Sequence, residues 1–345
     1  MLSGKRGGDL DRRQFLQVAG AGALGLGLFG AVGCGDSGSE AASGGGGGGS
    51  YKGEISASLY KEVPDNVVFM VALKQGYFKD SSLNLDPVSY KRGSDAIRGV
   101  AKSGMGSSSA LSGILAYAEG LTDLRIVGTN LAATTNVFLT PAKSSIRTPA
   151  DLKGKKLGVS APTTSVQLTA LAMLESVGLT DKDVKLIDVK GGPESIVAMQ
   201  NGLVDAGWSS PPMSVELVQK GEFRLLYEGA SHPPQLVNTA LFSTKSMLDR
   251  NGDAVKRWIE AIAKAHAFLK ADPAAAGRIY AGVTGVDEAV ATATIERYAP
   301  QFKIGVDRAL FDSQIAAAKQ LGTLTKEVRY EDLVFDEYAR AAGSA

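Results

Sequence analysis

Hydroxyl side chains gather at two places in this sequence where a predicted strand gives way to a helix. Each place holds three in a row, Ser107-Ser108-Ser109 and Thr163-Thr164-Ser165. A single hydroxyl is enough to cap a helix N-terminus, so the surplus can bind a ligand together with free helix N–H groups. Neither run contains a Lys or an Arg. The pattern predicts recognition by hydroxyls and helix ends, which leaves a weak anion and a neutral polar solute both open.

Two further junctions of this kind add other side chains to the candidate ligand site, namely Asp65, Asn66, Trp208 and Ser209. Asp65 and Asn66 also suit helix capping, which is a common role of these residue types before a helix. Trp208 ends a predicted strand and precedes the sequence Ser-Ser-Pro-Pro. It is therefore either a core residue or an apolar wall at the rim of the site.

The residue types argue against several kinds of chemistry. The chain has one cysteine and two histidines that lie far apart, so a thiolate or imidazole metal site is not expected. It contains no Walker-type loop, no HExxH sequence and no GxSxG elbow. With 37 basic and 36 acidic residues it has no excess positive charge for nucleic acid. We predict no catalytic residue, no metal, no cofactor and no nucleic-acid partner.

The body of the chain alternates short β-rich segments with helical patterns, which is typical of sheets built from βαβ units. The alternation runs once before about residue 139 and again after about residue 152, and the pattern beyond residue 241 is mostly helical. The simplest arrangement is an α/β fold of two lobes. Each lobe has a parallel-rich sheet with flanking helices, and the second lobe is inserted into the first.

Two extended segments, Asn136–Pro141 and Val237–Thr244, are the predicted crossings between the lobes. They place lobe I at residues 51–138 and 243–345, and lobe II at residues 139–242. Ligands of open parallel sheets bind outside the carboxyl ends of the strands. The candidate side chains should therefore face one another across an interlobe cleft, with the two crossings acting as a hinge.

The first 34 residues follow the order of a secretory signal, with a basic start, an apolar run and small residues before Cys34. Arg12-Arg13 resembles the core of a twin-arginine export signal, and the residues that end at Cys34 resemble a lipobox, whose cysteine is lipidated. Residues 35–50 are a Gly/Ser-rich linker. We expect an exported body in the periplasm or tethered through Cys34 to the outer face of the cytoplasmic membrane. The alternative is an uncleaved membrane anchor.

Three segments carry a resemblance to a known family. They are VALKQGYFK at 71–79, TPADLKGKKLGV at 148–159 and AMQNGLVDA at 198–206. Through them, the chain from Gly53 to Ala342 resembles the solute-binding proteins of nitrate/sulfonate/taurine-type ABC importers, a group that includes NMT1/THI5-like proteins. The resemblance implies a periplasmic-binding-protein fold of type II, with ligand contacts from the junction loops described above.

The same resemblance implies a monomeric receptor, not an enzyme, that captures a small organic anion of the sulfonate, nitrate or taurine class. The receptor would deliver this ligand to an ABC permease in the membrane. One alternative is a neutral or aromatic solute, such as a pyrimidine precursor. A second alternative is an enzyme on the same fold, and a third is a sensor or adhesion module that delivers no cargo.

Overall fold

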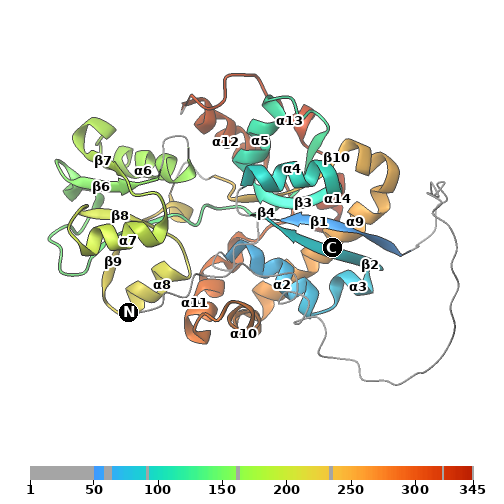
Figure 1. Ribbon diagram of the computed structural model, residues 1–345, viewed down its shortest axis with the longest axis horizontal. Helices are drawn as coiled ribbons and strands as arrows, with labels where there is room; N and C mark the ends of the chain where they lie inside the picture. The colour runs from blue at the N-terminus through green and yellow to red at the C-terminus, as the bar shows by residue number, and fades with distance from the viewer. Residues whose placement is uncertain are drawn as a thin grey trace, which may run out of the picture.

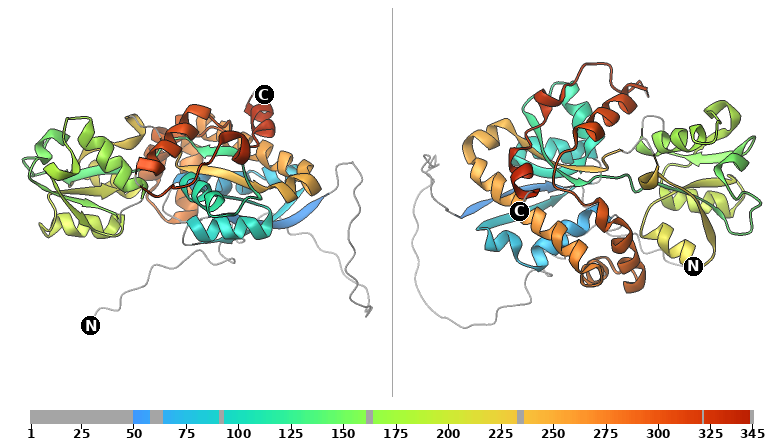
Figure 2. Two further views of the ribbon diagram at one scale, coloured as in Figure 1. Left: turned by 90° about the horizontal axis from the view of Figure 1, so that it is seen from above. Right: turned by 180° about the vertical axis from the view of Figure 1, so that it is seen from behind.

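The computed structural model describes residues 50–57, 64–90, 93–160, 164–232, 236–320 and 322–343. The predicted signal segment, Cys34 and most of the predicted linker lie outside these residues. Figure 1 shows two lobes side by side, and Figure 2 shows them from above and from behind. Within the described part of the chain, no helix combines the length and apolar character needed to cross a membrane.

The larger lobe is built on a five-stranded sheet with the order β2-β1-β3-β10-β4. Its strands are β1 (Tyr51–Ala57), β2 (Leu83–Ser89), β3 (Met105–Ser109), β4 (Leu124–Leu131) and β10 (Thr239–Thr244). β1 pairs in parallel with β2 and β3, whereas β10 runs antiparallel to β3 and β4. The strand that arrives last in the sequence therefore lies inside the sheet rather than at its edge.

The smaller lobe repeats this arrangement, with the strand order β7-β6-β8-β5-β9. Its strands are β5 (Val137–Pro141), β6 (Lys156–Val159), β7 (Lys185–Asp188), β8 (Ala206–Ser209) and β9 (Phe223–Glu228). β6 is parallel to β7 and β8, and β5 is antiparallel to β8 and β9. Each sheet thus contains one antiparallel strand, and in each case it is the strand by which the chain enters from the other lobe.

Both sheets are covered on two faces, and the alternation of side chains along the strands shows why. In β10, Leu241 packs into one hydrophobic cluster while Ala240 and Phe242 pack into another. In β5, Phe138 faces one cluster and Leu139 faces another. Successive side chains of a strand point to opposite faces, so a strand that is apolar at consecutive positions must be buried on both sides.

Helices cover the faces of the two sheets. In the first half of the larger lobe they are α2 (Val67–Lys74), α3 (Tyr77–Asp80), α4 (Gly93–Ser103) and α5 (Ala110–Ala118). The smaller lobe has α6 (Ser165–Glu175), α7 (Gly192–Gln200) and α8 (Met213–Gln219). The chain then returns to the larger lobe with α9 (Lys245–Ala271), α10 (Pro273–Thr284), α11 (Glu288–Tyr298), α12 (Arg308–Gln320), α13 (Tyr330–Leu333) and α14 (Glu337–Gly343). The long helix α9 packs against α2 and buries Trp258 completely.

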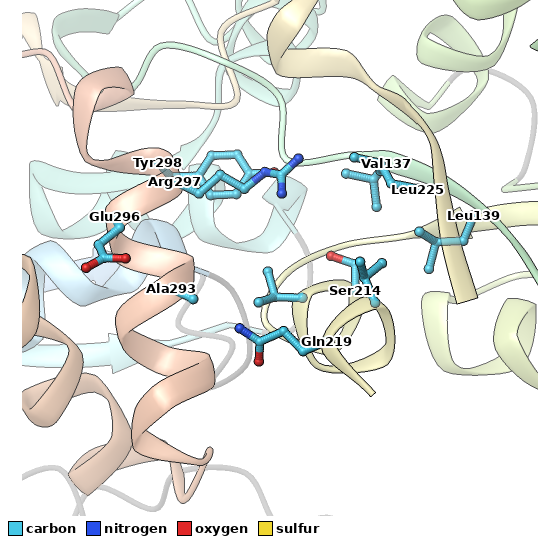
Figure 3. Close-up of a pocket in the computed structure, with 11 residues that line it drawn as sticks. Val137, Leu139, Ser214, Gln219, Leu225, Ala293, Glu296, Arg297 and Tyr298 are labelled. Atoms are coloured by element: carbon cyan, nitrogen blue, oxygen red, sulfur yellow. The ribbon is translucent and has the colours of Figure 1, made fainter. Parts of the chain in front are cut away.

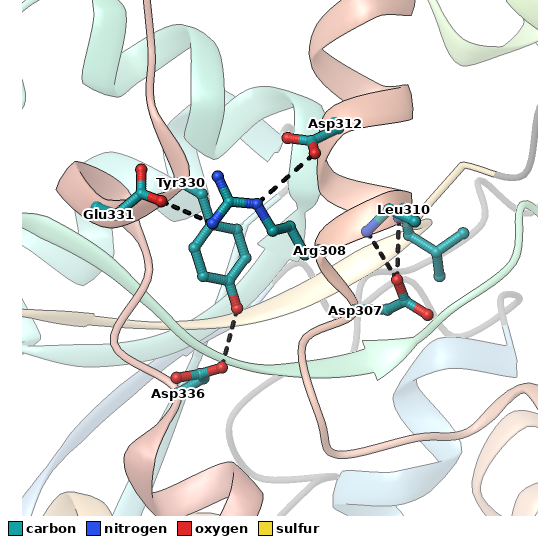
Figure 4. Close-up of polar contacts among 8 residues, drawn as sticks. Asp307, Arg308, Leu310, Asp312, Tyr330, Glu331 and Asp336 are labelled. Carbon is teal, nitrogen blue, oxygen red and sulfur yellow. Dashed lines mark hydrogen bonds and ion pairs between the residues drawn. The ribbon is translucent and has the colours of Figure 1, made fainter.

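A network of charged side chains ties α12 to α13 near the C-terminus (Figure 4). Arg308 at the start of α12 donates to Glu331 at 2.6 Å, and its guanidinium lies 5.0 Å from the centre of the Tyr330 ring. The Tyr330 hydroxyl in turn donates to Asp336 at 2.9 Å. Arg308 and Glu331 are largely exposed, so their ion pair contributes little stability on its own.

The predicted two-lobed α/β architecture is confirmed, with three local differences. The Ser-rich segment predicted as a junction loop is strand β3, and the two extended crossings are themselves strands, β5 and β10. Both sheets are accordingly mixed. β4 ends at Leu131 and β5 begins at Val137, and β9 ends at Glu228 and β10 begins at Thr239, so the predicted lobe limits at 138/139 and 242/243 fall within β5 and β10.

A polar contact joins the two lobes beside the second crossing. Glu228, the last residue of β9, accepts hydrogen bonds from Arg297 Nε at 2.5 Å and from the Tyr298 hydroxyl at 3.2 Å, both at the end of α11. Burial raises the pKa of Glu228, but the hydrogen bond and charge of Arg297, with help from Ser231 and Tyr298, outweigh it. The pKa of Glu228 therefore lies below its usual value.

We expect Glu228→Gln to lower the free energy of unfolding at neutral pH by about 1 kcal/mol, because it removes a charged hydrogen-bond acceptor from a partly exposed pair. The folded-state pKa is lowered, so this contribution is present above the unfolded pKa of about 4.3 and is lost as the pH falls through the folded pKa. Urea denaturation at about pH 7 and about pH 3 measures the difference. Glu216→Gln, at an exposed pair on α8, is the control. Equal effects of the two substitutions at both pH values would contradict the assignment.

Candidate functional site

A polar cleft of about 270 Å³ lies between the two lobes. It is bounded by the carboxyl ends of β3 and β8, by the starts of α2, α4 and α6, and by the residues just before β5 and β10. These strand ends and helix N-termini meet because the antiparallel strands begin beside the positions where their parallel neighbours end. This is the edge of an open sheet at which ligands bind.

Most of the side chains predicted for the ligand site line this cleft, namely Asp65, Asn66, Ser107, Ser108, Ser109, Ser165 and Trp208. Two others do not. The Thr164 hydroxyl caps α6 by accepting a hydrogen bond from Gln167 N at 3.3 Å, and the side chain of Ser209 is completely buried. Ser210 lines the cleft instead. Thr163 lies outside the described residues.

Other residues of the lining were not predicted, namely Gly93, Thr135, Asn136, Ser210, Asn238 and Thr239. Asn136 donates to Ser165 Oγ at 3.2 Å and to Thr169 Oγ1 at 3.4 Å, and so links the first crossing to the start of α6. Asn136 and Asn238 stand at or next to the starts of the segments predicted as crossings. A polar residue at the start of an extended crossing segment is the sequence feature that could have identified these two asparagines as part of the site.

Asp65 is held in place from several elements. Asn238 Nδ2 donates to its Oδ2 at 2.9 Å, and Asn130 Nδ2 donates to its backbone oxygen at 2.9 Å. Burial raises the pKa of Asp65 to about 6, although its own backbone N–H and the Thr239 hydroxyl oppose the rise. Its Oδ1 is buried and has no hydrogen-bond partner among the described residues. The cleft thus contains an acceptor without a donor.

His266 supports this corner of the cleft from beneath. Its Nε2 lies 3.1 Å from Asn130 Oδ1, and Asn130 uses its amide N–H groups toward Asp65 and Thr239. Asn130 Oδ1 is therefore the acceptor, and His266 Nε2 is the donor. Burial, together with the nearby charge of Lys270, lowers the pKa of His266 to about 3. The imidazole is neutral and serves to orient Asn130.

A second and larger cavity, of about 430 Å³, lies between α8 and α11 (Figure 3). Its lining is mixed, with Val137, Leu139 and Leu225 on one side and Ala293, Glu296, Arg297 and Tyr298 of α11 on the other. Arg297, its cationic side chain, is engaged by Glu228. We place the functional site in the smaller cleft, because that cleft combines strand ends, helix N-termini and an unsatisfied buried polar atom.

A family model described as "NMT1/THI5 like" matches residues 63–276, which is more than half of the chain. The chain belongs to the NMT1/THI5-like family. The resemblance inferred from the sequence is thereby confirmed. Among curated proteins, this NMT1/THI5-like chain is 26% identical to a Haemophilus influenzae protein provisionally named for thiamine biosynthesis, over 61% of this chain and 67% of that protein.

A Brucella abortus protein, provisionally named as a binding protein, is 30% identical over 151 residues. This match covers 43% of the NMT1/THI5-like chain and 46% of the Brucella protein, so it spans less than half of that relative.

Solved structures show the same fold. The alkanesulfonate-binding protein SsuA of Xanthomonas axonopodis pv. citri, bound to MOPS, is 22% identical with a TM-score of 0.67, over 83% of this chain and 98% of its own. Escherichia coli SsuA is 19% identical with a TM-score of 0.72, over 83% and 92%. The desulfurization enzyme DSZB is 16% identical with a TM-score of 0.67, over 84% and 98%. The predicted periplasmic-binding-protein fold is confirmed, and proteins named for binding and a protein named as an enzyme share it.

We expect Asp65→Asn to stabilise the unliganded protein at about pH 8 by about 3 kcal/mol, which is the cost of ionising a carboxyl whose pKa is about 6 in the folded state and 3.8 in the unfolded state. Because the folded pKa is raised, the stability of the native protein is greatest below the unfolded pKa and falls as the pH rises through about 6. The gain should therefore vanish near pH 4.

Urea denaturation across this pH range measures the effect, with Asp80→Asn on the exposed end of α3 as the control for loss of one charge. A variant less stable than the native protein at about pH 8 would mean that the ionised carboxyl is already stabilised in the empty cleft.

Proposed function

We propose that this NMT1/THI5-like protein is the solute-binding receptor of an ABC importer. It captures a small polar solute in the interlobe cleft and delivers it to a membrane permease. The observation that carries this proposal is that the cleft is lined by both lobes and by both crossings between them. A ligand there contacts residues of both lobes and of both crossings.

Lobe closure gives such a receptor its signal. A solute that touches Ser107 of one lobe and Trp208 of the other makes its full set of contacts only when the lobes are together. Its binding energy then favours the closed form, since a ligand shifts an equilibrium by its difference in affinity for the two states. The permease distinguishes loaded from empty receptor by this change of shape.

The lining of the cleft bears on the class of solute. An organic anion of the sulfonate, nitrate or taurine class was the first expectation, and SsuA proteins with this fold are named for sulfonate binding. Among the described residues that line the cleft, however, Asp65 is the sole charged side chain. A carboxylate repels an anion at close range, so the lining supports the alternative of a neutral or aromatic solute over a strong anion.

Native mass spectrometry of the purified full chain tests the receptor proposal by identifying a solute that copurifies, and calorimetry then measures its affinity. We expect Ser165→Ala to weaken that affinity about tenfold, because one hydrogen bond to the solute is lost. The neighbouring Thr164→Ala removes the cap of α6 and should lower the stability by about 1 kcal/mol without comparable loss of affinity.

Chemical conversion of the bound solute during the measurement would favour an enzyme on this fold. Loss of affinity in both variants, in proportion to their loss of stability, would mean that Ser165 acts only through the helix it begins.

We further propose that export and lipidation at Cys34 tether the receptor to the outer face of the cytoplasmic membrane. The signal-like order of residues 1–34 and the linker that follows support this proposal. Cys34→Ser should move most of the protein from the membrane fraction to the soluble fraction, because the acyl chains provide the attachment. Immunoblotting of fractionated cells measures this. Retention of the variant in the membrane would favour an uncleaved anchor instead.

A further inference from the structure

Two described residues that line the cleft have a buried side-chain atom without a hydrogen-bond partner, Asp65 at Oδ1 and Trp208 at Nε1, and Asp65 Oδ1 is the one that can carry a negative charge. Asp65 is 7% exposed and lies on the wall of the cleft, in the short helical turn Pro64–Asn66 that leads into α2. Its other oxygen already accepts from Asn238. A buried acceptor with no donor costs about 1–3 kcal/mol, and more if it is charged. The fold therefore maintains an unfavourable arrangement at the place where a solute is expected.

The hydrogen bonds from Asn130 and Asn238 do not require a carboxyl group at this position. They use the backbone oxygen and Oδ2 of Asp65, and an asparagine could accept both with its own oxygen atoms. What an asparagine cannot supply is a full negative charge directed at a ligand. Groups whose ionisation is strongly perturbed in a cleft are candidates for function.

The remainder of the lining fits a nitrogen donor. No Lys, Arg or His is among the described residues that line the cleft, whereas Asp65 is among them. Trp208, on the wall formed by the other lobe, offers an aromatic surface, and aromatic faces attract ammonium and amidinium groups. The serines of β3 add hydroxyls that can both donate and accept.

We propose that Asp65 determines the specificity of the cleft by accepting, at Oδ1, a hydrogen bond from an amino, ammonium or amidinium nitrogen of the solute. This inference rests on the proposed receptor function and narrows its ligand to nitrogen-bearing compounds. Asp65 and the solute then form a charge-assisted hydrogen bond inside a desolvated site, where such bonds are strongest.

Proton release provides a signature that a purely structural role would not produce. Near pH 5 the carboxyl of the empty cleft is mostly protonated, since the pKa of Asp65 is about 6. A cationic solute lowers that pKa and displaces the proton. The contacts of Asp65 come from Asn130, Asn238 and Thr239, none of which titrates here, and His266 behind Asn130 stays neutral because its pKa is about 3.

Calorimetry on the full chain with three matched pairs of probes tests the proposal. The pairs are benzylamine and benzyl alcohol, 2-aminopyridine and 2-methylpyridine, and taurine and isethionate. In each pair, one nitrogen donor is replaced by a hydroxyl or a methyl group. We expect the member with the amino group to bind at least tenfold more tightly in every pair that binds, and Asp65→Asn to remove most of that preference.

Titration of benzylamine near pH 5, in two buffers of different ionisation enthalpy, should show release of up to about one proton by the native protein and none by Asp65→Asn. Asp80→Asn, which also loses one carboxylate but on the exposed surface of α3, should behave as the native protein in both measurements.

Equal or tighter binding of the oxygen or methyl members, unaffected by Asp65→Asn, would overturn the role of Asp65 while leaving the receptor function intact. Failure of all six probes and of every copurifying solute to bind would count against the receptor function itself, and the inference about Asp65 would fall with it.

Discussion

The structure depends on two strands that each enter a sheet from the opposite lobe. β5 begins only a few residues after β4, and β10 returns to the first sheet after β9. Each is antiparallel to both of its neighbours, so each begins beside the carboxyl ends of parallel strands. The crossings, the helix N-termini and the strand ends must therefore meet at one place. The cleft and the two crossings therefore lie together as a consequence of the order in which the strands enter the sheets.

Asparagines consolidate this meeting point. Asn130 is the second-last residue of β4, Asn136 precedes β5, and Asn238 precedes β10. Each is buried or lines the cleft. Asn130 and Asn238 both donate to Asp65, and Asn136 donates to Ser165 at the start of α6. A side-chain amide carries both donors and an acceptor, so it can satisfy strand ends and helix starts that cannot pair with each other. The polar side chains of the cleft are thus held in defined positions before any solute arrives, which reduces the entropic cost of binding.

Sequence patterns predicted the lobes and most of the hydroxyl-bearing wall, because both follow from local periodicity and from residue types before helices. The prediction that residues 107–109 form a loop was wrong, because they belong to strand β3. Gly has low strand propensity, and the pairing of β3 depends on strands that are distant in sequence. Ser209 and Ser210 illustrate a finer failure. Strand side chains alternate between faces, so Trp208 and Ser210 reach the cleft while Ser209 turns inward. The contacts of Asn130 with Asp65 and of Asn238 with Asp65 join residues too distant in sequence for any local pattern to indicate.

A binding site that recognises its solute through a buried acid differs from one that relies on surface charge. An exposed carboxylate is hydrated in the empty protein, so a solute that binds it must displace water and gains little. The fold already excludes water from Asp65 in the empty protein. The free-energy cost of this desolvation is therefore part of the stability of the empty protein and not of the binding step. A solute with a suitable donor relieves it, whereas a solute without one leaves it in place. The burial that lowers the stability of the empty protein therefore also increases the difference in affinity between a solute with a donor and a solute without one. This difference determines the specificity.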